Sequence, residues 1–310
     1  MHLGNGAVTP GCALMGLSAA GIGVGAAGLM LGRSGLDRQR LLTAGVLGAV
    51  VFAVQAINVP VLPFASAHLV GGVVLAWVAG VPLGLLTMAM VLLMQALLLG
   101  DGGLMALGVN IVNMAIVPAL LVALAKRMQK QQGSVTRQAV LAGVCGGLAV
   151  LGAAILIPLQ VSLFRTSEQL AGWNAFALEM VTTHALVGLA EGMLTVAILA
   201  LLDRLAISGA LDRGRLILTG VTGLAGALLV LPFASSMPDG YEAAVERSGL
   251  TPTIQSLAGF NHKVAEIQDG LVGALPAVER LMLLAGALLT GLCLIGLGRL
   301  LQRDSHMVQG

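Results

Sequence analysis

Long apolar runs, broken by charges, prolines and turn residues, dominate this chain. Residues 41–99, 102–125 and 138–164 contain no Asp, Glu, Lys or Arg. A membrane-spanning helix needs roughly 20 apolar residues, so each run can hold one span or more. The short alternating segments of a membrane β-barrel are missing from the sequence. The pattern therefore predicts an all-α, polytopic helical membrane protein.

Breaks in the apolar runs divide the chain into nine candidate spans. They cover residues 12–31, 42–57, 69–80, 83–99, 104–125, 138–163, 174–202, 215–234 and 278–301. The third span is short, and the Val81-Pro82 step after it could be a kink within one longer span instead of a turn. The distribution of basic residues decides between these two readings.

With nine spans, most of the basic residues fall on one side of the membrane. That side receives Arg33, Arg38, Arg40, Lys126, Arg127, Lys130, Arg137, Arg204, Arg213, Arg215, Arg299 and Arg303, and the other receives Arg165, Arg247, Lys263 and Arg280. A single span over 69–99 would place the 33–40 and 126–137 clusters on opposite sides. Since basic loops are cytoplasmic, we expect nine spans in a cell inner (plasma) membrane, with the N-terminus outside and the C-terminus in the cytoplasm.

Composition supports the membrane assignment and excludes several functions. Of 310 residues, 57% are hydrophobic and 10% are charged, against about 25% charged in soluble domains. The net charge of +2 is too small for a nucleic-acid-binding surface. The three cysteines are isolated in apolar stretches, so we interpret them as helix-packing residues. Phosphate-loop, H-E-x-x-H and G-x-S-x-G motifs are missing, which argues against an enzyme that hydrolyses ATP, peptides or lipids.

The spans divide the chain into two parts. Residues 1–205 hold seven spans with short connections, and residues 206–310 hold two spans around a polar loop, 235–277. Five acidic residues against two basic ones in that loop could attract cations weakly through their field, but we expect a plain solvated loop. The turn at 100–103 (Gly-Asp-Gly-Gly) predicts Asp101 as a turn residue or helix N-cap. Small-residue pairs at Gly21/Gly25, Gly143/Gly147 and Gly188/Gly192 predict close helix packing.

Candidate chemistry concentrates on histidines at the predicted outer ends of the spans: His2, His68 and His184. A free α-amine at Met1, the amide nitrogen of His2 and its imidazole can chelate one ion through fused five- and six-membered rings. A fourth nitrogen would complete a planar four-nitrogen set, which is typical of Ni²⁺ or Cu²⁺. We predict His68 as that donor, because it follows a proline-interrupted segment, 58–67, that we expect to line a cavity.

Two further observations bear on this candidate site. The first residues, MHLGNGAVTPG, have no basic region of the kind that starts a signal peptide. We therefore expect them to be retained and to face the outside. The seven N-terminal spans contain only two acidic residues, Glu179 and Glu191, so no carboxylate cluster is predicted there for a hard cation. An incidental histidine at position 2 is the alternative interpretation.

Several motifs together resemble the substrate-binding (S) subunits of energy-coupling factor nickel and cobalt importers, the CbiM/NikM-like proteins. These motifs are Met1-His2, Asn58-Val59-Pro60-Val61 with Ser66-Ala67-His68-Leu69-Val70-Gly71-Gly72, the stretch from Gln95 to Met114, and His184-Ala185-Leu186-Val187-Gly188 with Glu191. Residues 206–310, with Pro238-Asp239-Gly240-Tyr241-Glu242 in their loop, resemble the small NikN-like auxiliary subunit, fused here in one chain. Residues 3–10 depart from the family, because the usual acidic residue is missing there.

The resemblance implies a seven-helix binding bundle plus two further transmembrane helices. It implies metal ligation by Met1, His2 and His68, the same residues that the chelate argument selects, with Asn58, Ser66 and His184 as candidates that orient the ligands. It also implies high-affinity uptake of Ni²⁺, with Co²⁺ as the alternative. The chain would then be a transporter subunit and no enzyme. A transmembrane coupling (T) subunit and two cytoplasmic ATPases would be its partners.

Three alternatives stay open from the sequence. A secondary transporter or channel for a small solute would need polar residues near the membrane midplane, and spans three to five offer few. An assembly protein without cargo would make His2 incidental. Within the favoured reading, His184 could hydrogen-bond near the ligand or pair structurally with Glu179 or Glu191, and we favour the structural pairing.

Overall fold

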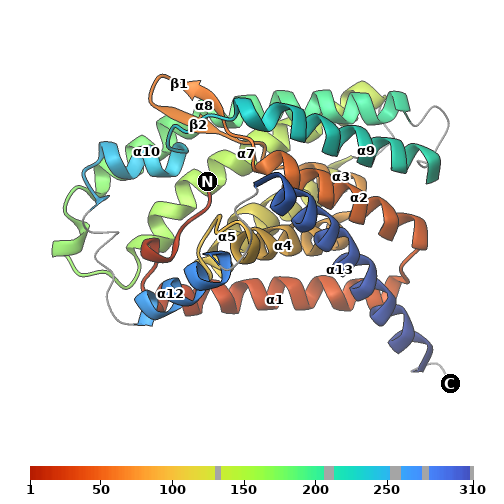
Figure 1. Ribbon diagram of the computed structural model, residues 1–310, viewed down its shortest axis with the longest axis horizontal. Helices are drawn as coiled ribbons and strands as arrows, with labels where there is room; N and C mark the ends of the chain where they lie inside the picture. Colours follow the sequence, from red (N-terminus) through yellow and green to blue (C-terminus); the bar gives the residue numbers. More distant parts are fainter. Residues whose placement is uncertain (130–133, 206–212, 252–259, 274–278, 308–310) are drawn as a thin grey trace.

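The computed structural model describes residues 1–129, 134–205, 213–251, 260–273 and 279–307 as a helical bundle (Figure 1). Its elements are η1 (Asn5–Ala7), α1 (Pro10–Ser34), α2 (Arg38–Gln55), β1 (Val59–Leu62), β2 (Ala65–Ala67), α3 (Gly72–Val78), α4 (Val81–Leu98), α5 (Leu107–Ile111), η2 (Val112–Ile116), α6 (Val117–Met128), α7 (Val135–Ser162), η3 (Glu168–Leu170), α8 (Trp173–Leu205), α9 (Arg213–Val230), η4 (Leu231–Phe233), α10 (Gly240–Arg247), α12 (Phe260–Gly273) and α13 (Glu279–Met307).

The predicted all-α, polytopic membrane class is confirmed. Within the described residues, six helices are long and apolar enough to cross a membrane: Pro10–Ser34, Val81–Leu98, Leu107–Met128, Val135–Ser162, Trp173–Arg204 and Gly214–Phe233. Their apolar side chains face outward as well as inward, as in a helix surrounded by lipid. The predicted boundary between the two parts of the chain falls at residue 205, and residues 206–212 directly after it lie outside the described residues. Two stretches of the predicted 235–277 loop, 252–259 and 274–277, also lie outside them.

Each of the nine predicted segments contains a helix, but the third is incomplete. Helix α3 has seven residues, which at 1.5 Å per residue covers about 10 Å of a hydrocarbon core about 30 Å thick. The chain reaches α3 through non-helical residues, and every residue from 65 to 76 is buried. Irregular backbone at membrane depth requires such burial in protein. The number of membrane crossings stays a prediction.

Two basic clusters meet at the same end of the bundle. The Arg40 guanidinium donates to the Ala79 carbonyl at 3.2 Å, and the Lys126 ammonium donates to the Trp77 carbonyl at 2.9 Å. Both therefore lie at the turn between α3 and α4, as the count of nine requires. Figure 1 shows the C-terminus and the α1–α2 turn at this end, with α10, α12 and the β-hairpin at the opposite end.

The proline-containing segment after α2 forms a small hairpin instead of irregular chain. Strands β1 and β2 are antiparallel, and Val59 pairs with Ala67. Asn58 and His68 each lie one residue beyond that pair, so the hairpin brings them out side by side at its open end. Pro60 is tolerated because a two-stranded hairpin leaves edges where no N–H is needed.

The C-terminal part of the chain packs against the N-terminal part. Helices α9 and α13 contact α2, α13 also contacts α4, α12 contacts α4, and α10 contacts α8 (Figure 1). The expectation that 235–277 is a plain solvated loop is wrong for part of its described residues, although others are exposed. Gly240, Tyr241 and Val245 of α10 and Gln268 of α12 are buried, because they cover the end of the bundle where the chain begins.

Candidate metal centre

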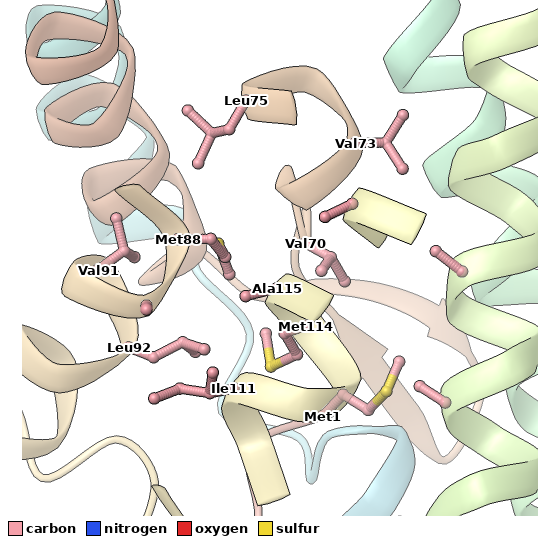
Figure 2. Packing of buried hydrophobic residues seen from close by; sticks show 14 of the residues in the cluster. Met1, Val70, Val73, Leu75, Met88, Val91, Leu92, Ile111, Met114 and Ala115 are labelled. Carbon is pink, nitrogen blue, oxygen red and sulfur yellow. The ribbon is translucent and has the colours of Figure 1, made fainter. Parts of the chain in front are cut away.

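The N-terminal residues thread into the bundle and are fixed there by backbone contacts. Met1, His2 and Leu3 are all buried. The Leu3 N–H donates to the Asn110 side-chain oxygen at 3.0 Å, and the Asn110 amide donates back to the Leu3 carbonyl at 3.1 Å. The Met1 side chain belongs to the same hydrophobic cluster as Val70 and Met114 (Figure 2). These contacts place the α-amine inside the protein.

The Gly-Asp-Gly-Gly turn fits closely against this N-terminal segment. The Gly103 N–H donates to the Leu3 carbonyl at 2.8 Å, and a Cβ added at Gly103 would lie 2.2 Å from the Asn5 nitrogen. Gly102 has φ of +85°, a conformation that favours glycine. The two glycines therefore allow the backbones of residues 3–5 and 101–103 to approach each other.

His68 presents one ring nitrogen to the N-terminus. Its Nδ1 lies 3.0 Å from the Leu69 carbonyl oxygen, and since a carbonyl only accepts, Nδ1 carries the proton and Nε2 keeps a lone pair. That Nε2 lies 3.4 Å from the Met1 amine nitrogen. Burial, with a further effect from the Met1 ammonium, lowers the pKa of His68 to about 3. The imidazole is therefore neutral and able to ligate a metal at physiological pH.

The His2 imidazole stacks on His68 beside the amine. The ring centroids are 5.0 Å apart and the rings are inclined by 18°. His2 Nδ1 lies 3.1 Å from Asp101 Oδ1, while Nε2 has no hydrogen-bond partner among the described residues. A six-membered chelate ring would use Nδ1, so metal binding requires this nitrogen to leave Asp101.

Asp101 lies in the turn between α4 and α5, as one of its two predicted roles requires, but the alternative role as a helix N-cap is wrong. The next helix, α5, begins at Leu107 and has no side-chain cap. Burial raises the pKa of Asp101. The charge of His2 and the hydrogen bond from His2 lower that pKa by more, so it lies well below its usual range. The carboxylate is ionised and accepts from the His2 ring.

A second carboxylate, Asp239, contacts the N-terminus from the C-terminal part of the chain. Its Oδ2 forms an ion pair with the Met1 ammonium. Its Oδ1 accepts from the Tyr241 and Glu242 N–H groups at 2.8 and 2.9 Å, which caps α10 in a capping box with Glu242. Sequence reasoning missed Asp239 as a site residue, although the D-x-x-E spacing at 239–242 was a detectable signal for the cap.

Glu191 holds the chain that follows His68. Its two carboxylate oxygens accept from the Val70 and Gly71 N–H groups at 2.8 and 2.9 Å, and Gly71 has φ of +72°. Glu191 thereby fixes the turn from His68 into α3. His184 pairs with neither Glu179 nor Glu191, so the pairing we favoured is wrong. Its Nδ1 donates instead to the Met180 carbonyl at 2.8 Å.

The three residues predicted to orient the ligands, Asn58, Ser66 and His184, lie in two different places in the structure. Asn58 lines the space beside His2 and His68. Ser66 donates its hydroxyl to the Met237 carbonyl at 2.7 Å and so holds the chain that leads to Asp239. His184 is buried against Gly240, at the start of α10. Asn58 is thus beside the candidate donors, while Ser66 and His184 position the Asp239 segment.

Gln268 of α12 ties the same region from another side. Its side-chain oxygen accepts from the Asn5 amide at 2.8 Å and from the Leu104 N–H at 3.1 Å. Its amide donates to the Ala96 and Gly102 carbonyls at 3.0 and 2.8 Å. Gln268, which the sequence did not single out, therefore joins the N-terminal segment to the Gly-Asp-Gly-Gly turn.

Chemically, this arrangement offers nitrogen donors from backbone and side chains together. Two nitrogens that bind one ion at about 2.0–2.1 Å in adjacent planar positions lie about 2.9 Å apart, close to the 3.4 Å between the Met1 amine and His68 Nε2. Among the described residues, no three His, Cys, Asp or Glu side chains are placed to hold an ion by themselves. A metal here would need the amine and amide of the chain.

The N-terminus is thus buried beside His2 and His68 within a polytopic helical membrane protein. Residues 2–208 match the family model described as the cobalt uptake substrate-specific transmembrane region. This match covers most of the chain, and the chain belongs to that family.

Named relatives agree with this assignment. The probable fused nickel transport protein LarMN of Lactiplantibacillus plantarum is 32% identical over 169 residues, 52% of this chain and 52% of that protein. The cobalt transport protein CbiM of Sorangium cellulosum is 32% identical over 161 residues, 51% of this chain and 71% of that protein. The chain therefore matches about half the length of the fused nickel relative.

A solved structure shares the fold. The crystal structure of a truncated transition metal transporter aligns with a TM-score of 0.55 and 26% identity, covering 66% of this chain and 99% of that one. The resemblance to CbiM/NikM-like proteins is thus confirmed, as is metal transport as the general function of the chain.

Proposed function

We propose that this protein captures Ni²⁺ from outside the cell, as the metal-binding membrane subunit of an ATP-driven energy-coupling factor importer. The observation that carries the proposal is the meeting of the Met1 amine, His2 and His68 Nε2, with 3.4 Å between the amine and that imidazole nitrogen. We assign the Met1 amine, the His2 amide and imidazole, and the His68 imidazole as the four ligands.

The donor set favours Ni²⁺ over the alternative, Co²⁺. Four nitrogens in one plane suit low-spin d⁸ Ni²⁺. Cu²⁺ has a higher intrinsic affinity for such ligands, so its exclusion would depend on availability. The relatives include both a nickel and a cobalt transport protein, and a parallel titration with both ions decides between them.

Transport would need further subunits. The sequence has no phosphate loop, so we assign ATP hydrolysis to two cytoplasmic ATPases and coupling to a transmembrane T subunit. The end that carries Arg40 and Lys126 would face the cytoplasm, and the end with α10, α12 and the β-hairpin would face outward, in an inner (plasma) membrane.

The test is calorimetric titration of the purified protein with Ni²⁺, comparing it with His2→Gln. This substitution keeps the Met1 amine and the backbone amide but removes the imidazole that closes the six-membered chelate ring. Because linked donors gain roughly 10²–10⁴ in affinity over separate ones, we expect His2→Gln to weaken Ni²⁺ binding by at least about a hundredfold. The visible band of a planar four-nitrogen Ni²⁺ complex should disappear with it.

Two histidine variants form a matched pair for the same titration. His68→Ala removes the fourth donor and should weaken binding as strongly. His262→Ala changes an exposed residue on α12 that pairs with Glu266 and should leave affinity unchanged. Equal Ni²⁺ affinity in the native protein and His2→Gln would contradict the proposed ligands.

A further inference from the structure

A polar cavity of about 250 Å³ adjoins the candidate metal centre. His2 and His68 form part of its wall, so whatever enters it lies beside the proposed ligands. The rest of its polar lining comes from separate elements: the end of α2, the start of the β-hairpin, the turn after α4 and the start of α10.

The lining is rich in oxygen acceptors. It contains the carboxylates of Asp101, Asp239 and Glu242 together with the side-chain amides of Gln55 and Asn58. None of its described lining residues is Lys or Arg. The cavity therefore combines acceptor atoms with three carboxylates, of which Asp239 contacts the Met1 ammonium and Asp101 contacts the His2 ring.

Gln55 gives independent evidence for a ligand. It is 1% exposed, and its Nε2 donates to the Val70 carbonyl at 2.5 Å. Its Oε1 has no hydrogen-bond partner among the described residues, and the same holds for Asn58 Oδ1. A buried acceptor without a partner costs about 1–3 kcal/mol, so these oxygens call for a group that donates hydrogen bonds.

A hydrated divalent cation meets each of these requirements. Its positive charge suits the Glu242 carboxylate on the cavity wall, and its water ligands are donors for the unpartnered amide oxygens. The described His, Cys, Asp and Glu side chains do not converge tightly enough to ligate an ion directly, so contact through water fits the geometry better than direct coordination.

We propose that this cavity is an entry site, which holds the divalent cation with its water shell before the nitrogen ligands replace those waters. This inference rests on the proposed function, because it assigns the step that precedes chelation. The entry site is built of oxygen and admits Mg²⁺ or Mn²⁺ as readily as Ni²⁺. Discrimination then occurs at the nitrogen ligands, which bind Mn²⁺ weakly and Ni²⁺ strongly.

The experiment uses Mn²⁺ as the probe, because Mn²⁺ favours oxygen ligands and its electron paramagnetic resonance spectrum reports binding. The full-length protein is titrated with Mn²⁺ and compared with Glu242→Gln and Glu246→Gln. Gln at position 242 keeps an oxygen that can accept from the Asp239 N–H, as Glu242 does now. Glu246 lies one turn further along α10 and does not line the cavity.

We expect one weak Mn²⁺ site in the native protein that Mg²⁺ displaces by competition. Glu242→Gln should weaken it at least fivefold and slow Ni²⁺ capture in stopped-flow measurements, while the final Ni²⁺ spectrum stays the same. Glu246→Gln should match the native protein in every measurement.

Two results would overturn the entry site. One is the lack of any Mn²⁺ binding, and the other is an equal effect of the two substitutions. The failure of the proposed function is distinguishable, because the native protein would then lack the planar four-nitrogen Ni²⁺ band altogether. A native protein with that band but without the Mn²⁺ site would retain the function and lose only this inference.

Discussion

The two carboxylate oxygens of Asp239 make different contacts. One oxygen caps α10 and the other pairs with the Met1 ammonium. Burial raises the pKa of Asp239, but the ammonium and the hydrogen bonds lower it more, to about 2. The carboxylate is therefore charged at every pH at which the protein would bind metal.

Proton release on chelation fixes the sign of the pH dependence that we predict for Ni²⁺ binding. Chelation must release protons from the Met1 ammonium and the His2 amide, so affinity rises with pH. His68 does not contribute to this rise, because its pKa of about 3 leaves it unprotonated. We expect affinity to fall by about tenfold per pH unit, for each proton released, between about pH 8 and pH 5.

Titrations at several pH values in buffers of different ionisation enthalpy would count the released protons. An affinity that is constant across this range would show that the amine and amide are not ligands. An inflection near pH 3 alone would instead point to His68 as the only nitrogen that matters.

At the scale of elements, the pairs of glycines four residues apart lie at a close helix contact in α7 and α8 but not in α1. A Cβ added at Gly143 of α7 would lie 2.7 Å from the Gly192 carbonyl oxygen of α8, and one at Gly147 would lie 3.0 Å from that of Gly188. The predicted close packing is confirmed for these pairs. Gly21 and Gly25 of α1 have open space around them within the described chain, so there the prediction is wrong.

The contrast makes a prediction for stability. Gly143→Ala forces α7 and α8 apart and should destabilise the protein by about 1–3 kcal/mol. Gly21→Ala meets nothing and gains helix propensity, so it should be neutral or stabilising by up to about 1 kcal/mol. Thermal unfolding in detergent compares the two. Equal losses of stability would show that glycine flexibility, and not helix contact, matters at position 143.

At the scale of the whole molecule, the two parts of the chain form one structure. Helix α2 lies between α9 and α13, and α10 and α12 cover the end of the bundle that holds Met1 (Figure 1). Asp239 and Gln268 both reach the N-terminal segment from this cover. The segment 206–310 is therefore part of the candidate centre's environment, whichever way it acts in transport.

Gln268 offers a direct test of that dependence. Gln268→Leu keeps the side-chain size but leaves the Leu104 N–H and the Gly102 carbonyl without their partners. A fully buried group left unpaired costs about 1–3 kcal/mol, and these partly buried groups set a smaller loss. We therefore expect a lower unfolding temperature and Ni²⁺ affinity reduced several-fold in calorimetry. Asp269→Asn, the exposed neighbour, should change neither, and equal effects of both would refute a specific role for Gln268.

The sequence is enough to predict those site residues whose side of the membrane follows from the order of the spans. Met1, His2 and His68 were predicted together because they share the outer ends of the spans, and the structure brings them into contact. Asp239 and Gln268 could not be placed this way, because their contacts depend on how a long connection folds back over the bundle. Asp101 lay within a turn motif, which concealed its contact with the His2 ring.

The ion pair between residues 1 and 239 also orders events during synthesis. The first residues of the centre leave the ribosome long before the residues that enclose them. At about 5–20 residues per second, the interval is on the order of ten seconds to a minute. The Met1 amine therefore lacks its carboxylate partner while most of the protein is being made. Asp239 is synthesised only after the eighth predicted segment, 215–234. Completion of the centre reports that nearly the whole chain has reached its place in the membrane.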